Sequence, residues 1–327
     1  MKAIVRHEYG PADVLELADV PKPAPAENDV LIRVRAAALN PLDWHLMRGV
    51  PWFLRLFVGV RKPKKIRLGM DVAGTVVTIG LGVKDFRPGD EVFGSVEGAL
   101  ADYVCGPTSA VVLRPANVTS DDAAAVPIAG LTALQALRDK GHVKSGDRVL
   151  INGAAGGVGT FAVQIAKWLG ASVTGVCSSR NVDLVRSIGA DRVIDYTGED
   201  FTVGSERYDV IFDLVGNRSL AEIRRVLATR GTFIGCGGGG PETPASSLLA
   251  GMLRQVITGW FTKQKLVGIL AKRNKKDLEL LGQLLAGEHI KPVIDRKYPL
   301  SEVPDAIRYL EQGHAHGKVV ISVDGLE

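Results

Sequence analysis

Four glycines follow an apolar run in the segment VLINGAAGGVGTF, residues 149–161. In the dinucleotide-binding pattern G-x-G-x-x-G, the three glycine positions fall on Ala154, Gly156 and Gly159, so two of the three match. Such a loop binds phosphate through backbone N–H groups and the positive end of the helix that follows. The pattern therefore predicts a dinucleotide site, and a tight strand–helix turn without a ligand is the alternative. The predicted loop comprises Ala154, Gly156, Gly157, Val158 and Gly159.

The three pattern positions have different expected roles. Gly156 lets the backbone approach a pyrophosphate, and Gly159 lets the helix pack close to the strand. Ala154 stands where a turn glycine is usual, and an alanine is tolerated there if its φ stays negative.

The end of the second strand in such a unit, about 20 residues after the loop, selects the cofactor. An acidic side chain there accepts a hydrogen bond from the ribose 2′-hydroxyl of NADH and repels the 2′-phosphate of NADPH. This chain has Ser178, Ser179 and Arg180, and the next acid is Asp183. Hydroxyl and guanidinium groups bind phosphate, so the sequence favours NADPH. A solvated turn role for Arg180 is the alternative.

The elements around this loop predict an α/β protein. Residues 1–122 contain short runs rich in Val and Ile, separated by Pro and Gly clusters, which is typical of β-structure. After a helical segment interrupted near Pro127, strands alternate with helices, and this alternation predicts a parallel sheet. The final apolar run, GKVVISV, predicts a strand that rejoins the first domain.

The composition of the chain indicates the class of protein and argues against some functions. The 327 residues suffice for two domains, and 46% hydrophobic with 23% charged residues is a globular composition. A formal net charge of +4 gives no case for nucleic-acid binding. The three cysteines are far apart, which argues against a zinc or disulfide framework and favours a cytoplasmic location. The first ten residues, MKAIVRHEYG, predict a strand rather than a signal peptide.

Several motifs together resemble the medium-chain dehydrogenase/reductase superfamily. Residues 152–181 resemble its cofactor segment, and A-x-G-G-V-G is the usual loop of its zinc-independent quinone oxidoreductase branch. GMDVAGTVVTIG, FRPGDEVFG, GALADYV, LTALQAL and GKVVI resemble further motifs, in the same order. The resemblance implies a GroES-like, β-rich catalytic domain over residues 1–122, completed by 272–327. It implies a Rossmann domain, a doubly wound parallel sheet that binds NADPH, over 123–271.

In the zinc-dependent members of this superfamily, a Cys, a His–Glu pair and a second Cys hold the catalytic zinc. By the resemblance, Asn40, Met70, Asp71 and Ala129 occupy these positions here. Amide, thioether and methyl groups cannot replace thiolate and imidazole ligands, so we expect no metal. The pair His314 and His316 fits a polar turn before the last strand better than a metal site.

The resemblance also implies catalytic positions. Asn40 would lie beside the nicotinamide and the substrate carbonyl, where its amide could donate to a developing oxyanion; a turn residue before Pro41 is the alternative. Asp43 is expected to hold that turn. His45 could donate a proton, although a structural histidine is equally compatible. Lys318 matches a family G-K motif before the last strand, with a surface salt bridge as the alternative.

Further cofactor contacts are implied at the strand ends. Thr132 would contact the phosphate or ribose on the nicotinamide side, or cap a helix N-terminus. Tyr196 would stack near the adenosine phosphate. The ends of the fourth and fifth strands would also line the dinucleotide, unless they are only tight turns. These positions are Val215, Gly216, Gly235 and Gly237.

Together these observations predict an NADPH-dependent, zinc-independent enzyme that transfers hydride to quinones or to α,β-unsaturated aldehydes or ketones. Conjugated acceptors supply their own electron sink and need only hydrogen-bond donors for the enolate, whereas simple alcohols need a Lewis acid. An NADPH-binding regulatory or interaction protein with little catalysis is one alternative. An alcohol dehydrogenase-like carbonyl reductase is another.

Two segments of the sequence predict partners other than the small-molecule substrate. The run KLVGILA, residues 265–271, predicts an exposed edge strand through which a homodimer would form. Residues 50–67, the insert segment, join an aromatic stretch to the basic cluster RKPKKIR. We favour a lid over the substrate site for this segment. Weak peripheral contact with an anionic membrane is the alternative.

Overall fold

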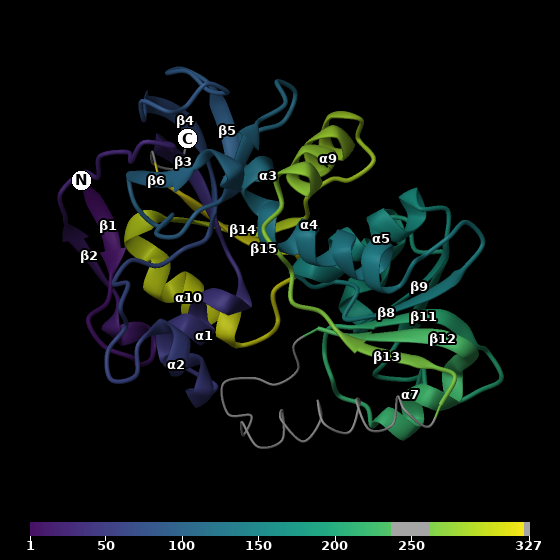
Figure 1. The fold of residues 1–327 in the computed structure, drawn as a ribbon. Helices are drawn as coiled ribbons and strands as arrows, with labels where there is room; N and C mark the ends of the chain where they lie inside the picture. Colours follow the sequence, from purple (N-terminus) through teal and green to yellow (C-terminus); the bar gives the residue numbers. More distant parts are fainter. Residues whose placement is uncertain (237–261, 324–327) are drawn as a thin grey trace. The chain divides into compact units, whose positions relative to one another are not determined.

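The computed structural model describes residues 1–236 and 262–323 (Figure 1). The chain divides into two compact units, Met1–Leu131 with Arg273–Glu327, and Thr132–Lys272. The first boundary follows residue 131 rather than 122, because helix α3 (Ser120–Ala125) packs on strands of the first unit. The second boundary lies within one residue of the expected position.

The first unit is built on a seven-stranded sheet with the order β14-β15-β3-β4-β5-β7, and β6 also pairs with β3. A separate two-stranded sheet joins β1 to β2. The strands are β1 (Lys2–Val5), β2 (Glu16–Asp19), β3 (Asp29–Leu39), β4 (Asp71–Ile79), β5 (Glu91–Ser95), β6 (Tyr103–Pro107), β7 (Val111–Leu113), β14 (Ile294–Pro299) and β15 (Lys318–Ser322).

The last strand confirms the expected return of the chain to the first domain. β15 runs antiparallel to β3, with Val319 opposite Leu39, and parallel to β14. Val319, Val320 and Ile321 are fully buried, because β15 lies between two strands and its apolar residues face the core. The N-terminal strand β3 thus depends on a segment from the other end of the chain.

Helices cover this sheet. The predicted break at Pro127 is present, since α3 ends at Ala125 and α4 (Pro127–Leu134) starts with the proline. The leucine stripe of α9 (Lys275–Ala286) is buried as its spacing predicts. The other helices of this unit are α1 (Pro41–Arg48), α2 (Arg55–Val58), α10 (Val303–Glu311) and the short turns η1 (Ala12–Val14), η2 (Trp52–Leu54), η3 (Thr108–Ala110) and η6 (Leu300–Glu302).

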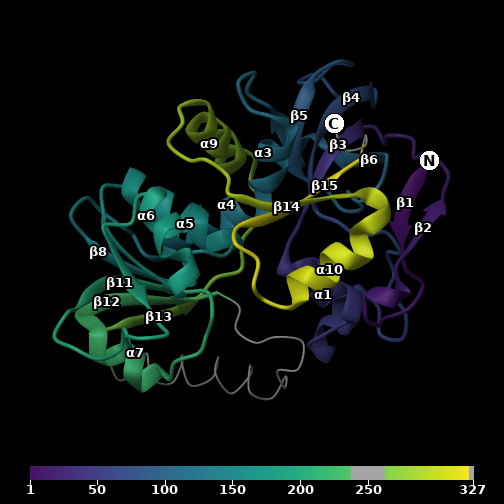
Figure 2. The same ribbon diagram turned by 180° about the vertical axis from the view of Figure 1, so that it is seen from behind.

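The second unit contains a six-stranded parallel sheet with the order β10-β9-β8-β11-β12-β13. This is the doubly wound order in which the first and fourth strands, here β8 and β11, meet at the switch point. Figure 2 shows α5 and α6 on one face of this sheet and α7 on the other. Its strands are β8 (Arg148–Asn152), β9 (Ser172–Cys177), β10 (Arg192–Asp195), β11 (Tyr208–Asp213), β12 (Leu227–Gly235) and β13 (Lys265–Gly268).

The helices of the second unit are α5 (Gly157–Trp168), α6 (Val182–Ser187), α7 (Leu220–Val226), η4 (Gln135–Lys140) and η5 (Ser179–Asn181). The run SLAEIRRVLATR, residues 219–230, predicts one continuous helix, but β12 begins at Leu227, which pairs with Tyr208. Gln264 stabilises this early strand start by donating hydrogen bonds to the carbonyls of Leu227 and Ala228. No helix within the described residues is long and apolar enough to cross a membrane.

Candidate functional site

The turn after β8 uses a different glycine from the one that the pattern predicts. Gly153 has a φ of +88°, in the region that favours glycine. Ala154 is buried and lies outside the positive-φ region, as the sequence requires of an alanine there. The glycine of this turn therefore lies one residue nearer the N-terminus than in the pattern. The loop can form its turn without a glycine at position 154.

Gly156 and Gly159 are glycines for different reasons. A Cβ atom at Gly159 would overlap the carbonyl oxygen of Gly153, so close packing of α5 on the loop requires glycine. A Cβ at Gly156 would meet nothing nearer than that same oxygen, 3.5 Å away. The protein itself does not require glycine at position 156, which lies directly before α5. A side chain there would instead fill the open space at the helix N-terminus, where a phosphate binds.

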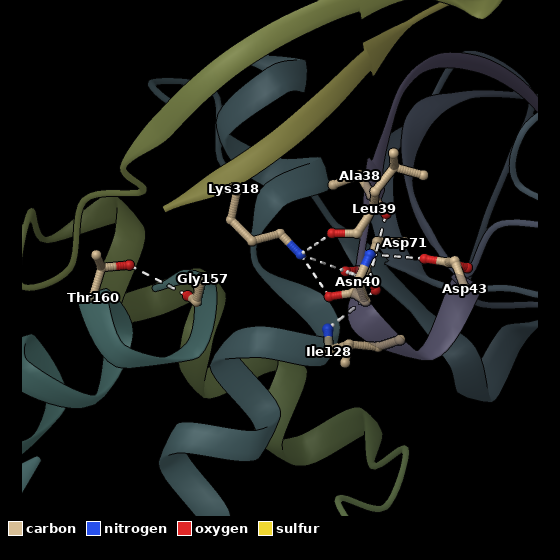
Figure 3. A network of polar contacts seen from close by, with 9 residues as sticks. All are labelled: Ala38, Leu39, Asn40, Asp43, Asp71, Ile128, Gly157, Thr160 and Lys318. Atoms are coloured by element: carbon tan, nitrogen blue, oxygen red, sulfur yellow. Dashed lines mark hydrogen bonds and ion pairs between the residues drawn. The ribbon is translucent and has the colours of Figure 1, made fainter. Parts of the chain in front are cut away.

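The loop residues also differ in how exposed they are to solvent. Ala154 and Gly159 are buried, whereas Gly156, Gly157 and Val158 are partly exposed at the start of α5. The buried hydroxyl of Thr160 donates to the carbonyl of Gly157, 3.3 Å away, within the first turn (Figure 3). The N–H of Gly156 donates to the carbonyl of Gly153 at 3.1 Å and so closes the turn. Gly157 and Val158 present the backbone N–H groups at the start of the helix.

A hydrogen-bonded pair joins the carboxyl ends of β8 and β11. Asn152 and Asp213 are opposite each other in the parallel register, and Asn152 Nδ2 donates to Asp213 Oδ1 at 2.8 Å. The same oxygen accepts from the backbone N–H groups of Val215 (3.0 Å) and Gly216 (2.9 Å). The pair lies at the switch point of the sheet and fixes the turn after β11. Sequence reasoning missed both side chains, although each is the polar last residue of an apolar strand.

The other predicted strand-end residues lie at this same edge. Val215 is exposed, Gly216 has a φ of +71°, and Gly235 ends β12 opposite Asp213. Gly237 lies outside the described residues. Thr132 is buried in the second turn of α4, so it does not occupy a helix N-terminus.

The serines and arginine predicted to select the cofactor follow β9. Arg180 is exposed and makes no hydrogen bond or ion pair with any described residue, whereas Ser179 Oγ donates to Asp195 Oδ2 at 2.6 Å. Asp195 ends β10 directly opposite Cys177, the last residue of β9. Tyr196 follows it, half exposed, and donates its N–H to the carbonyl of Cys177. The carboxylate of Asp195 lies on the strand next to the one that precedes Ser178, so the sequence around Ser178 does not reveal it.

Two predicted catalytic residues, Asn40 and Lys318, contact each other in a buried cluster (Figure 3). Lys318 Nζ donates to Asn40 Oδ1 at 2.6 Å and to the carbonyl of Leu39 at 3.0 Å. It also lies 3.6 Å from Asp71 Oδ2. Because only 2% of the Lys318 side chain is exposed, the alternative of a surface salt bridge is wrong.

Asp71 links this cluster to the rest of the unit. Its Oδ2 accepts from Asn40 Nδ2 at 2.8 Å, and its Oδ1 accepts from the N–H of Ile128 at 3.1 Å, at the start of α4. Asp43 Oδ2 accepts from the N–H of Asn40 at 2.8 Å, so it holds the turn before α1 as expected. The four side chains thereby connect the ends of β3, β4 and β15 to two helices.

Burial dominates the ionisation of this cluster. It raises the pKa of Asp43 to about 7 and that of Asp71 to about 6, and it lowers the pKa of Lys318. Two carboxyl groups and one amine thus lie close together away from water, and the nearest opposite charge only partly offsets the desolvation. The cluster can hold a proton near neutral pH.

The geometry does not support an oxyanion-donor role for Asn40. One amide hydrogen is directed to Asp71 and the other to the carbonyl of Ala38, 3.5 Å away, and the residue is buried. Both donors are therefore used within the protein. Asn40 instead orients Lys318 and Asp71.

The contacts of His45 do not support its expected role as proton donor either. Its Nδ1 lies 2.9 Å from the carbonyl oxygen of Val50, and a carbonyl only accepts, so Nδ1 carries the hydrogen. Burial lowers the pKa of His45, which favours the neutral ring. In that form Nε2 is an acceptor. The ring also stacks on Trp44 with 3.6 Å between centroids, which fits the structural alternative.

The whole chain has known relatives. The family model described as "Alcohol dehydrogenase GroES-like domain" matches residues 26–116, and the one described as "Zinc-binding dehydrogenase" matches residues 188–321. The chloroplast envelope quinone oxidoreductase homologue of Arabidopsis thaliana is 35% identical over 98% of this chain and 98% of its own. This chain belongs to the medium-chain dehydrogenase/reductase superfamily.

Other superfamily members extend the match. A protein named NADPH-dependent alkenal/one oxidoreductase, chloroplastic, from Arabidopsis thaliana is 36% identical over 98% of this chain and 79% of its own. The structure of the quinone oxidoreductase from Coxiella burnetii shares 33% identity and a TM-score of 0.84, over 99% of both chains. The predicted family and the predicted fold class are confirmed.

The zinc-ligand positions of the superfamily do not fit zinc in this chain. Asn40, Met70 and Ala129 offer no thiolate or imidazole, and both oxygens of Asp71 are already bound by protein donors. The Lys318 ammonium lies beside that carboxylate, where a second cation would be repelled. Among the described residues, no group of three or more His, Cys, Asp or Glu side chains is placed to hold a metal.

Proposed function

We propose that this protein is an NADPH-dependent oxidoreductase that transfers hydride to quinones or to α,β-unsaturated aldehydes or ketones without zinc. The observation that carries the proposal is the loop at Gly156, which leaves open the space before α5 that a pyrophosphate fills. Relatives named quinone oxidoreductase homologue and NADPH-dependent alkenal/one oxidoreductase support the substrate class.

Specific residues of the second unit would hold the cofactor. The N–H groups of Gly157 and Val158 would bind the pyrophosphate, because the N–H of Gly156 already donates to the carbonyl of Gly153. The turn fixed by Asp213 would line the nicotinamide side. Arg180 would pair with the 2′-phosphate, because it is exposed and its guanidinium has no ion pair among the described residues. When bound, NADPH supplies the hydride.

The zinc-free part of the proposal rests on the donor set. Amide, thioether and methyl groups stand at three of the ligand positions and cannot replace thiolate or imidazole. The fourth position, Asp71, has both carboxylate oxygens bound by protein donors. A conjugated acceptor spreads the incoming charge over its own π-system, so it does not need that Lewis acid. The buried cluster of Asn40, Asp71 and Lys318 then serves to fix the ends of β3, β4 and β15.

A spectrophotometric assay tests this function. NADPH oxidation is followed with a panel of quinones, alkenals and simple alcohols or aldehydes, before and after exhaustive chelation. We expect turnover of the conjugated acceptors that survives chelation, with no stoichiometric zinc by elemental analysis. NADPH binding without turnover of any acceptor would favour a binding or regulatory protein. Chelator-sensitive activity confined to simple alcohols or aldehydes would favour the alcohol dehydrogenase-like alternative.

We also propose a homodimer. β13 pairs on one side with β12 and, among the described strands, has no neighbour on its other side. An unpaired edge strand favours pairing with a second copy of itself. Sedimentation at micromolar concentration tests this, and a stable monomer would contradict it.

For the insert segment, we propose a lid over the substrate. Trp52 and Phe57 are 62% and 77% exposed, although both are large apolar side chains. Tyr9 anchors the segment: the Arg55 guanidinium lies 4.6 Å from its ring centroid, and its hydroxyl donates to the carbonyl of Gly59 at 2.6 Å. An anchored segment with exposed aromatics suits an apolar cover that excludes water. Membrane contact is the competing assignment, and the two make different predictions.

A further inference from the structure

The adenosine end of the candidate cofactor site contains a carboxylate as well as a cation. Asp195 Oδ2 lies 2.6 Å from Ser179 Oγ, and Asp195 Oδ1 accepts from the N–H (3.0 Å) and hydroxyl (2.8 Å) of Thr197. The two hydroxyls are also within 3.0 Å of each other. The parallel register brings these groups together, because β9 and β10 end opposite each other at Cys177 and Asp195.

This carboxylate is charged and accessible. Hydrogen bonds from Ser179 and from Thr197 lower the pKa of Asp195, so it stays ionised across the neutral range. Arg180, one residue after Ser179, makes no ion pair with any described residue and does not neutralise it. A ligand that reaches Ser179 therefore meets one negative and one positive group.

The two charges have opposite preferences. A guanidinium favours a phosphate dianion, whereas a carboxylate accepts a hydrogen bond from a hydroxyl and repels a phosphate. NADPH and NADH differ in this one substituent. We propose that Asp195 is a specificity residue that opposes Arg180, binding the ribose 2′-hydroxyl of NADH and limiting the preference for NADPH. This inference rests on the proposed function, because it assumes that a nicotinamide dinucleotide occupies the site.

A conservative pair of variants tests the proposal. Asp195→Asn removes the charge and keeps an oxygen that can accept from Thr197. Asp200→Asn is the matched control, because Asp200 accepts from the N–H and hydroxyl of Thr202 in the same two-residue turn. Asp200 also carries one charge in the same unit, and it has no hydrogen bond to Ser179 among the described contacts. It differs from Asp195 in one respect, since its Oδ1 lies 3.4 Å from Nε of Arg218.

Dissociation constants of NADPH and NADH are measured by fluorescence titration, without substrate. We expect Asp195→Asn to tighten NADPH about tenfold and to weaken NADH about threefold, the scale of one unit charge beside a solvated phosphate. Asp200→Asn should leave the ratio of the two constants unchanged. Thermal unfolding of each variant shows whether the fold is kept.

The outcomes separate this inference from the proposed function. If the wild type binds neither cofactor, the proposed function fails. If both cofactors bind but Asp195→Asn changes their affinities equally, Asp195 only positions Ser179 and the inference is wrong. A ratio that shifts as much in Asp200→Asn would show a general charge effect and would also overturn it.

Discussion

The ammonium group of Lys318 lies 2.6 Å from the amide oxygen of Asn40, although 278 residues separate them in the sequence. The contact joins the first residue of β15 to the residue that follows β3. Asp71, at the start of β4, approaches both side chains. Three neighbouring strands are thus tied together at one end by a buried charged pair and one amide.

This relationship predicts a large loss of stability in Lys318→Met. The variant leaves Asp71 buried without its cation, which costs about 3–5 kcal/mol in the free energy of unfolding. Lys297→Met is the matched control, because Lys297 lies on the neighbouring strand β14 and pairs with Asp121 near the surface. That variant should cost less than about 1 kcal/mol. Urea denaturation measures both, and equal losses would contradict the buried role of Lys318.

The raised pKa values of Asp43 and Asp71 predict a pH dependence of stability. The folded state binds these protons more tightly than the unfolded chain, whose carboxyl pKa is near 3.8. Their favourable contribution is therefore full below about 3.8 and declines as the pH rises, until it is lost above about 6 for Asp71 and above about 7 for Asp43.

Asp43→Asn isolates this effect from the other carboxyl groups. The variant cannot ionise, so its stability relative to the wild type should rise as the pH is raised from about 5 to about 8. Chemical denaturation at both pH values gives the difference. A difference that stays constant over this range would show that Asp43 does not titrate there.

Two glycine variants should separate binding from folding. Gly156→Ala places a methyl group in the open space before α5, so it should weaken NADPH binding about tenfold or more with little change in Tm. Gly159→Ala forces a clash with the Gly153 carbonyl, so it should destabilise the unit by about 1–3 kcal/mol. Titration and thermal unfolding of both variants check this. Unchanged NADPH affinity in Gly156→Ala would count against the cofactor site.

Arg180 should set the cofactor preference. We expect NADPH to bind at least about tenfold more tightly than NADH, or about 1.4 kcal/mol for one charge-assisted contact. Arg180→Ala should remove this preference. Equal affinities in the wild type would show that the protein has no such preference. A preference that survives in the variant would assign the selection to other residues.

The lid and membrane assignments of the insert segment differ in what they predict for variants. Under the lid proposal, Trp52→Ala and Phe57→Ala raise KM for large apolar acceptors more than for small ones and leave liposome binding unchanged. Vesicle co-sedimentation that requires anionic lipid and is lost when Lys62, Lys64 and Lys65 are changed to Glu would instead make the segment a membrane contact.

The sequence predicts the local features of the site and misses the ones that need strand register. The apolar strand, the glycine loop and the helix after it are contiguous, so their pattern reveals them. Asp195 was missed because it reaches Ser179 only when β10 pairs with β9. Asn152 and Asp213 meet for the same reason across β8 and β11.

The family resemblance indicates positions but not the bonds that define their roles. The resemblance indicates Asn40 and Lys318, but the neighbouring sequence does not show which groups accept from Asn40. Its amide donates to Asp71 and to the Ala38 carbonyl. The turn glycine shifted from position 154 to Gly153 because backbone geometry, not the pattern, decides which residue takes a positive φ. Local patterns thus identify residues, and the tertiary fold decides what each one binds.

The position of β15 between β14 and β3 has a consequence for how the protein is made. The ribosome delivers β3 early, but its neighbour β15 emerges only after the entire second unit has been synthesised. The second unit is continuous in sequence and can fold as it leaves the exit tunnel. Until then β3 can pair with β4 and β6, but its residues 36–39 lack the partner that β15 later supplies. The nascent chain therefore completes its second unit before its first. The first unit would need a chaperone most in the interval before β15 is synthesised.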